Sequence, residues 1–151
     1  MTARAFEDFA VGERWESSPV TISEADIVAF GQANDPQPIH CDPHAAAVSR
    51  FGGLIASGWQ VAALSMRLFI EAGGYGETPV VGMGIDQLRW KKPVRPGDRL
   101  TVVREVVEMQ HSRSKPWFGI IRTEIQVINQ DAEVVMSMIS IGQVPARNGH
   151  Q

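Results

Sequence analysis

The side chains best suited to acid–base chemistry are concentrated in one segment, Asp35 to His44. Its sequence, DPQPIHCDPH, contains two aspartates, two histidines and the single cysteine of the chain. Carboxylate and imidazole groups are the side chains that most often move protons near neutral pH. The composition is compatible with three kinds of site: a metal centre, a thiol nucleophile, or an acid–base pair.

A metal centre would use His40, His44, Asp42 and the thiol of Cys41. Two histidines at i and i+4 share a face only inside one continuous helix, and Asp42-Pro43 places a helix start between them. We therefore expect no metal. A Cys41 nucleophile would need a neighbouring base such as His40 to take its proton. This is disfavoured, because adjacent residues on an extended segment point to opposite sides. We expect Cys41 to be a small buried side chain.

The third kind of site is an acid–base pair of Asp35 and His40. Pro36 and Pro38 stiffen the segment between them, so that a carboxylate and an imidazole can contact one water molecule. The spacing is equally compatible with a structural role, in which Asp35 caps a turn and His40 bonds a backbone carbonyl. The residues alone leave these two alternatives open.

The elements around this segment are predicted from capping signals. A first strand is expected around residues 14–22. Ser23 with Asp26 three positions later resembles a capping box, so a helix should begin there and end before Pro36, with Asp35 at its exit. Residues 35–40 should form a stiff, extended loop. Asp42 before Pro43 is typical of the start of a short helix, which ends near Phe51-Gly52-Gly53.

A long helix is predicted from about Gly58 to Ala72. Its long polar side chains Gln60, Arg67 and Glu71 project in nearly one direction, and apolar residues occupy most of the remaining circumference. This pattern favours a helix wrapped by a sheet.

Four strand signals follow, at about residues 81–90, 100–108, 120–127 and 133–141, with a bulge near Asp86-Gln87 and a turn at Arg95–Asp98. Together these elements predict an α+β domain with a curved antiparallel sheet around one helix. We expect one domain over residues 1–151, with a core at about 6–142 and a C-terminal tail at 143–151.

Composition limits the classes of function. The chain has 151 residues, of which 44% are hydrophobic and 21% charged, and 14 basic against 17 acidic side chains give a net charge of −3. This balance provides no overall attraction for nucleic acid or an anionic membrane. The lone cysteine fits a reducing compartment. The N-terminal region has no apolar leader, and polar residues interrupt the most apolar stretch, 54–73. We expect a soluble, cytoplasmic protein.

Four segments together resemble a known family. Residues 35–43 (DPQPIHCDP) match the pattern Asp-x-Asn-Pro-x-His-x-Asp-Pro, and further similarity lies at 6–12 (FEDFAVG), 54–58 (LIASG) and 93–98 (PVRPGD). On these motifs the chain resembles the MaoC-like dehydratases, which include the (R)-specific enoyl-CoA hydratases of the hot-dog fold. The resemblance extends from about Phe6 to Gly142. The departures are Gln37 for the usual asparagine, the additional Pro36, and Ser57 where many members have histidine.

The resemblance implies hydration of a trans-2-enoyl-CoA to an (R)-3-hydroxyacyl-CoA, or the reverse, without metal or redox cofactor. Asp35 would be the base on water, and His40 would orient the water and help deliver its proton. The backbone N–H of Gly58 would stabilise the thioester oxygen, which agrees with the free N–H groups of a helix start. Gln37 and Ser57 are candidate substrate contacts beside this site.

Coenzyme A carries phosphates, which require a local basic patch. Candidates for substrate binding are Arg89, Lys91, Lys92 and Arg95, with Arg99 close by. The same charges are compatible with solvated strand ends, and Arg113 with Lys115 is a second candidate.

Two alternative functions remain open, an acyl-CoA thioesterase and a non-catalytic acyl-CoA-binding subunit. We also expect a homodimer or higher homo-oligomer, because one curved sheet leaves edge strands to be covered. The partner would complete a tunnel whose depth depends on side chains such as Trp59, Met83 or Trp117.

Overall fold

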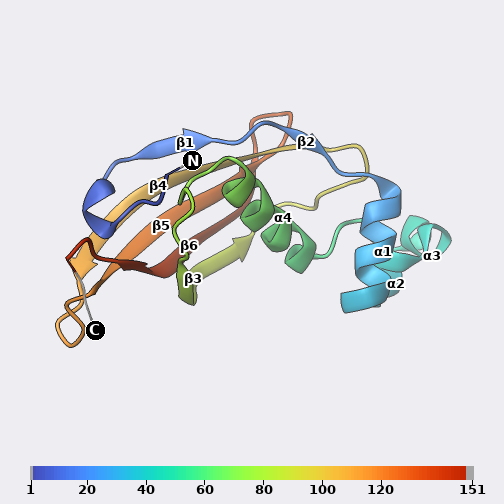
Figure 1. Ribbon diagram of the computed structural model, residues 1–151. Helices are drawn as coiled ribbons and strands as arrows, with labels where there is room; N and C mark the ends of the chain where they lie inside the picture. Colours follow the sequence, from blue (N-terminus) through green and yellow to red (C-terminus); the bar gives the residue numbers. More distant parts are fainter. Residues whose placement is uncertain (1, 149–151) are drawn as a thin grey trace.

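The computed structural model describes residues 2–148 and has a curved sheet that partly surrounds one helix (Figure 1). A short 3-10 turn, η1 (Phe6–Asp8), precedes strands β1 (Arg14–Glu16) and β2 (Val20–Thr21). Three helices follow, α1 (Glu24–Asn34), α2 (Pro38–Cys41) and α3 (Pro43–Val48), and then the long helix α4 (Gly58–Glu71). The remaining strands are β3 (Val81–Trp90), β4 (Arg99–His111), β5 (Phe118–Ile128) and β6 (Val134–Pro145).

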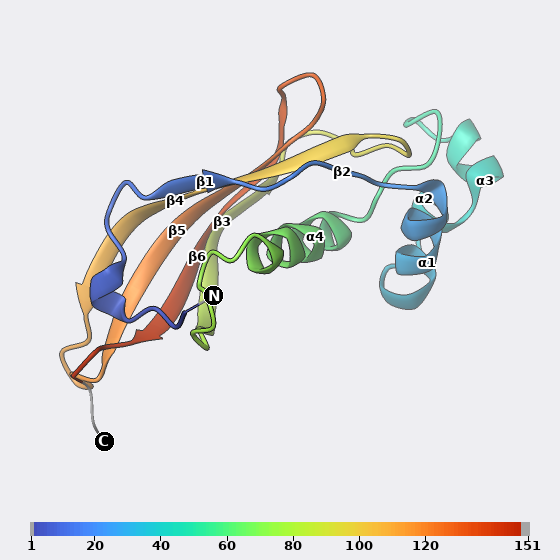
Figure 2. The same ribbon diagram turned by 45° about the horizontal axis from the view of Figure 1, so that its top comes forward.

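The sheet has the strand order β1-β4-β5-β6-β3, and each of these pairs is antiparallel. Strand β2 pairs with the start of β4. Helix α4 lies on the concave face, and the small helices α1 to α3 form a cluster beyond the N-terminal end of α4 (Figure 2). This is the α+β hot-dog arrangement expected from the sequence.

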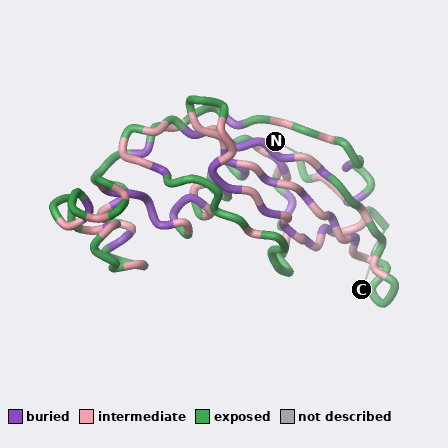
Figure 3. The backbone as a smooth tube through the Cα atoms, turned by 180° about the vertical axis from the view of Figure 1, so that it is seen from behind, coloured by how far each residue is buried: buried purple, intermediate pink, exposed green. Residues whose placement is uncertain are grey.

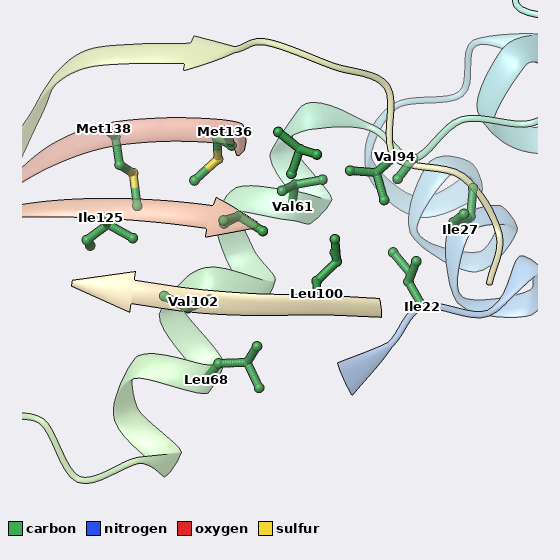
Figure 4. Close-up of a cluster of buried hydrophobic side chains, with 13 residues drawn as sticks. Ile22, Ile27, Val61, Leu68, Val94, Leu100, Val102, Ile125, Met136 and Met138 are labelled. Carbon is green, nitrogen blue, oxygen red and sulfur yellow. The ribbon is translucent and has the colours of Figure 1, made fainter. Parts of the chain in front are cut away.

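The core lies between α4 and the concave face of the sheet (Figure 4). Val61 and Leu68 of α4 pack with Leu100, Ile125 and Met136 of three neighbouring strands. Strand β5 alternates strictly between buried and partly exposed residues, because successive side chains of a strand point to opposite faces of a sheet. Burial of α4 therefore fixes where its first turn lies relative to the sheet.

Several local predictions are confirmed. Ser23 Oγ accepts a hydrogen bond from the N–H of Asp26, and Asp42 accepts from His44 and Ala45, so both helix caps form as expected. The register of β3 against β6 shifts between Asp86 and Arg89, at the predicted bulge. Gly97, with φ of 88°, completes the predicted turn before β4.

The prediction of an extended segment over residues 35–40 is wrong in part. Residues Pro38–Cys41 form the single helical turn α2, so His40 is helical. Proline is well tolerated at the first position of a helix, and only the residue before it is kept out of the helical region. Gln37 is accordingly extended, with ψ of 140°.

Two further expectations need correction. Helix α4 is not enclosed on all sides: Trp59, Met66 and Ile70 are 59%, 44% and 53% exposed in the single chain. Strand β3 is also exposed along nearly its whole length, because it lies at the edge of the sheet and only one of its two sides pairs with another strand, β6 (Figure 3).

The second correction concerns the C-terminal tail. Strand β6 continues to Pro145, three residues into the predicted tail, and Val144 is fully buried. Residues 149–151 of that tail lie outside the described residues.

Arg104 is a charged residue inside the core that the strand pattern did not predict. It is 1% exposed, and its guanidinium lies over the rings of Trp15, Phe69 and Tyr75. Nη2 donates to the carbonyl of Gly74 at 3.0 Å. Burial lowers the pKa of Arg104 to about 10, so the side chain is still a cation near neutral pH.

Among the described residues, no helix has the length and apolar content needed to cross a membrane.

Candidate active site

The turn between α1 and α2 brings Asp35 and His40 together. Asp35 ends α1, and its N–H donates to the carbonyl of Gly31 at 2.8 Å. Gly31 also faces α2, where an added Cβ would lie 2.9 Å from the Cβ of His40. The two helices therefore approach so closely because this position has no side chain. As a result, His40 Nε2 lies 3.2 Å from Asp35 Oδ2.

The tautomer of His40 follows from its second contact. The residue is 5% exposed, and Nδ1 of its ring lies 2.6 Å from the backbone oxygen of Ile55. Because a carbonyl oxygen can only accept, Nδ1 carries a proton and donates it, and Nε2 is the atom that faces the carboxylate. His40 therefore bonds a backbone carbonyl, as in the structural alternative, and its Nε2 also lies beside the carboxylate of Asp35. The acid–base role of the pair stays a prediction.

Two neutral groups hold the carboxylate of Asp35. Gln37 Nε2 donates to Oδ1 at 2.9 Å, and Ser57 Oγ donates to Oδ2 at 2.8 Å. The hydrogen bond from Gln37 and then that from Ser57 lower the pKa of Asp35 below its usual value of 3.8, and the charge of His40 lowers it further. Asp35 is therefore ionised near neutral pH and is able to accept a proton.

Gly58 lies directly after Ser57, at the start of α4, where the first N–H groups have no partner inside the helix. Trp90 of β3 packs on this glycine, and its Nε1 donates to the Gly58 carbonyl at 2.8 Å. A Cβ at position 58 would lie 2.4 Å from the ring of Trp90. Trp59 meets the same ring edge to face, with centroids 5.1 Å apart. A side chain at position 58 therefore requires Trp90 to move.

A pocket of about 300 Å³ is lined by some of these site residues. Its lining includes His40, Gly58, Trp90, Lys91 and Lys92. The structure therefore brings Asp35, His40, Gln37, Ser57 and Gly58 into one neighbourhood and places two of the four basic candidates beside it.

The other two basic candidates, Arg89 and Arg95, are not part of this lining. Arg89 Nη1 donates to the carbonyl of Leu88, and the N–H of Arg95 donates to Asp98 within the turn before β4. Lys92 pairs with Glu133. Of the residues named for tunnel depth, Trp59 lies at the site, whereas Met83 lines a separate pocket on β3 to β6.

Sequence reasoning missed Trp90 and Ile55. Ile55 acts through its backbone oxygen, which no side-chain pattern reveals. Trp90 lies among the basic residues 89–92, and no sequence motif indicated a role for it at the site.

No group of three or more histidine, cysteine, aspartate or glutamate residues is arranged to hold a metal ion within residues 2–148. Asp42 is used as the cap of α3, and His44 is exposed.

Comparison with known proteins gives a consistent result. Residues 8–128 match the model of the MaoC like domain. The crystal structure of the MaoC-like dehydratase from Rhodospirillum rubrum is 38% identical, with a TM-score of 0.87 over 96% of this chain and 99% of that one.

Two curated relatives are similar over most of their length. The "Uncharacterized protein YdeM" of Bacillus subtilis is 35% identical, over 82% of this chain and 86% of its own. The "3-hydroxybutyryl-CoA dehydratase" of Methylorubrum extorquens is 36% identical, over 73% of this chain and 68% of its own.

Replacing Gly58 by alanine should disturb the contact with Trp90. The new Cβ overlaps the indole ring, so the ring has to move and its hydrogen bond to the Gly58 carbonyl is lost. We expect a loss of about 1–3 kcal/mol in the free energy of unfolding and a changed near-ultraviolet circular dichroism spectrum. Gly53→Ala is the matched control, because its Cβ would lie 3.6 Å from Arg95, an ordinary contact. A Gly58→Ala variant with unchanged spectrum and stability would contradict the packing described here.

Replacing Ser57 by alanine should raise the pKa of Asp35 toward its usual value, because one hydrogen bond to the ionised carboxylate is removed. A carboxyl group whose pKa is lower in the folded protein than in the unfolded chain stabilises the fold at pH values above its unfolded pKa. This contribution is lost as the pH falls through the folded pKa. The destabilisation caused by Ser57→Ala should therefore be largest near neutral pH and shrink in acid. Carboxyl NMR titration measures the pKa, with Ser112→Ala as control. An unshifted Asp35 titration would show that Ser57 does not stabilise the ionised carboxylate.

Proposed function

Because the chain belongs to the MaoC-like dehydratase family, we propose that it adds water to a trans-2-enoyl-CoA to give an (R)-3-hydroxyacyl-CoA, or catalyses the reverse reaction. The observation that carries this proposal is the pairing of Asp35 Oδ2 with His40 Nε2 at 3.2 Å, beside the first turn of α4. A relative named as a 3-hydroxybutyryl-CoA dehydratase supports a coenzyme A thioester as the substrate.

In the hydration direction, Asp35 and His40 together bind one water molecule beside their contact. Asp35 takes a proton from this water while its oxygen forms a bond to C3 of the enoyl group. The electrons of the C2–C3 double bond move toward the thioester carbonyl, and the enolate then takes a proton at C2. The Nε2 proton of His40 passes to C2, and the proton that Asp35 took from water then replaces it on Nε2, so both groups return to their starting state.

Two features of the site suit this sequence of steps. The bond from His40 Nδ1 to Ile55 keeps Nε2 directed at the reacting atoms, so proton transfer needs no ring rotation. The N–H of Gly58 and the positive end of the α4 dipole are placed to stabilise negative charge on the thioester oxygen. Trp90 packs on this turn and restricts its movement.

Coenzyme A binding is assigned in this proposal to the basic side chains near the pocket. Lys91 and Lys92 line it, and Arg89 and Arg95 flank it in the sequence as more distant phosphate contacts. That the reaction needs no metal or redox cofactor, and that the protein is cytoplasmic, both remain predictions.

We further propose that the active form is a homodimer built on β3. This strand is an edge of the sheet and exposes Val81, Met83 and Ile85, with 60%, 49% and 46% of each residue accessible. The neighbouring face of α4 exposes Met66 and Ile70. A long, apolar edge strand beside an apolar helix face is an unusual surface for a monomer, and pairing with a second copy would cover both.

Hydration is tested with crotonyl-CoA by following the loss of absorbance of the conjugated double bond. Asp35→Asn should lower kcat/KM by about 10²–10⁴-fold, because the amide cannot take the proton from water. Asp131→Asn, in the exposed turn before β6, is the matched control and should retain full activity. Release of free thiol from saturated acyl-CoA, with no hydration, would favour thioester hydrolysis instead. Full activity of Asp35→Asn would refute the role given to this carboxylate.

The dimer is tested by sedimentation equilibrium. The wild-type protein should sediment with twice the mass of one chain, and Ile85→Lys should raise the dimer dissociation constant at least tenfold by placing a charge in the apolar edge. Val11→Lys, at a residue 62% exposed and outside β3 and α4, should leave the mass unchanged. A wild-type monomer at micromolar concentration is the result that excludes this interface.

A further inference from the structure

A second groove, of about 450 Å³, lies between α1 and α4 and is closed on one side by residues of β2. It shares no lining residue with the pocket that contains His40 and Gly58. Asn34 and Gln60 belong to its lining, and they are respectively the residue before Asp35 and the second residue after Gly58. The groove is therefore next in the chain to the proposed catalytic groups and is separate from the pocket that contains Lys91 and Lys92.

These two spaces match the two halves of a thioester. The pocket with Lys91 and Lys92 offers positive charge for the coenzyme, whereas the groove is lined mainly by apolar side chains, among them Val20, Ile22, Phe30 and Leu64. Its volume is within the range of pockets that bind small molecules. The groove is thus suited to the acyl portion of the substrate.

The side-chain amide of Gln60 is a polar group in the lining of the groove, near the start of α4. Its residue exposure is 8%, and its Oε1 atom is buried without a hydrogen-bond partner. A buried acceptor that loses water without gaining a donor costs about 1–3 kcal/mol. A terminal amide offers both a donor and an acceptor, and rotation about its last side-chain bond exchanges their positions.

The chemistry of Gln60 selects among possible acyl groups. A plain alkyl chain leaves the amide unsatisfied. A carboxylate cannot donate to Oε1, and the groove offers it no net positive charge, because Asp26 and Arg67 both belong to the lining. A hydroxyl group donates and accepts, so it satisfies the amide in either orientation.

The position of Gln60 along α4 sets where that hydroxyl lies. Two residues of helix separate Gln60 from Gly58, a rise of about 3 Å, whereas Arg67 is about 10 Å beyond Gln60. A group that contacts Gln60 is therefore close to the thioester and not at the end of a long chain.

Building on the proposed function, we propose that the groove between α1 and α4 binds the acyl group and that Gln60 selects short 2-enoyl thioesters with a hydroxyl on the carbon next to the double bond. Gln60 is in this view a specificity residue, and the water that reacts is held separately by Asp35 and His40.

The test compares two substrates of nearly equal shape, 4-hydroxybut-2-enoyl-CoA and pent-2-enoyl-CoA, which differ in a terminal hydroxyl or methyl group. The wild-type protein should have a kcat/KM about tenfold higher for the hydroxylated substrate. Gln60→Met keeps the length of the side chain without the amide and should abolish or reverse this preference. Gln126→Met, on the outer face of β5, is the matched control and should leave the preference unchanged.

Binding of the saturated analogues 4-hydroxybutanoyl-CoA and pentanoyl-CoA, which have no double bond to hydrate, is measured by calorimetry on freshly prepared ligand and separates this inference from the proposed function. A tenfold tighter Kd for the hydroxylated analogue that depends on Gln60 supports it even without turnover. Equal Kd and equal kcat/KM for the two members of each pair would overturn it while hydration of crotonyl-CoA still stands. A preference that survives Gln60→Met would overturn it as well.

Discussion

The burial of α4 on the concave face of the sheet is the interaction on which the rest of the structure depends. Val61 and Leu68 pack against strands β4, β5 and β6, and this fixes the axis of the helix. The position of its first turn then sets where the N–H of Gly58 and the side chain of Ser57 lie. Packing of an ordinary hydrophobic core therefore positions the polar groups of the site, because a close-packed interior permits little displacement.

The electrostatic arrangement at Asp35 depends on that packing. Ser57 Oγ, held at the start of α4, bonds one carboxylate oxygen, and Gln37 bonds the other. These bonds and the nearby imidazole stabilise the ionised form. A carboxylate at the end of a helix is thus kept ionised by neutral donors, and it has no arginine or lysine in direct contact within the described residues.

Sequence patterns predicted the parts of the fold that rest on local physics. The caps at Ser23 and Asp42 depend on a few adjacent residues, and the alternation of β5 depends on the two-residue period of a strand. The bulge near Asp86 was visible as a change of phase. The two prolines predict an extended segment, whereas Pro38 begins a helical turn, because proline is compatible with the first position of a helix.

Contacts between distant parts of the chain were beyond such reasoning. The bonds from His40 to Ile55, from Ser57 to Asp35 and from Trp90 to Gly58 each join residues that are at least fifteen positions apart. The sequence indicates one polar line of Gln60, Arg67 and Glu71 on α4, but Gln60 is buried, whereas Arg67 and Glu71 form an exposed pair. Which residues of an amphipathic helix are covered is decided by tertiary packing.

The short segment that leads into α4 has a consequence for protein engineering. Within four residues it supplies the carbonyl of Ile55 to His40, the hydroxyl of Ser57 to Asp35 and the amide of Gly58 at the helix start. These three groups share one stretch of backbone, so an insertion or deletion there would shift all of them at once. Grafting this chemistry onto another scaffold would therefore require residues 35–40 and 55–58 to be transferred together, as a matched pair.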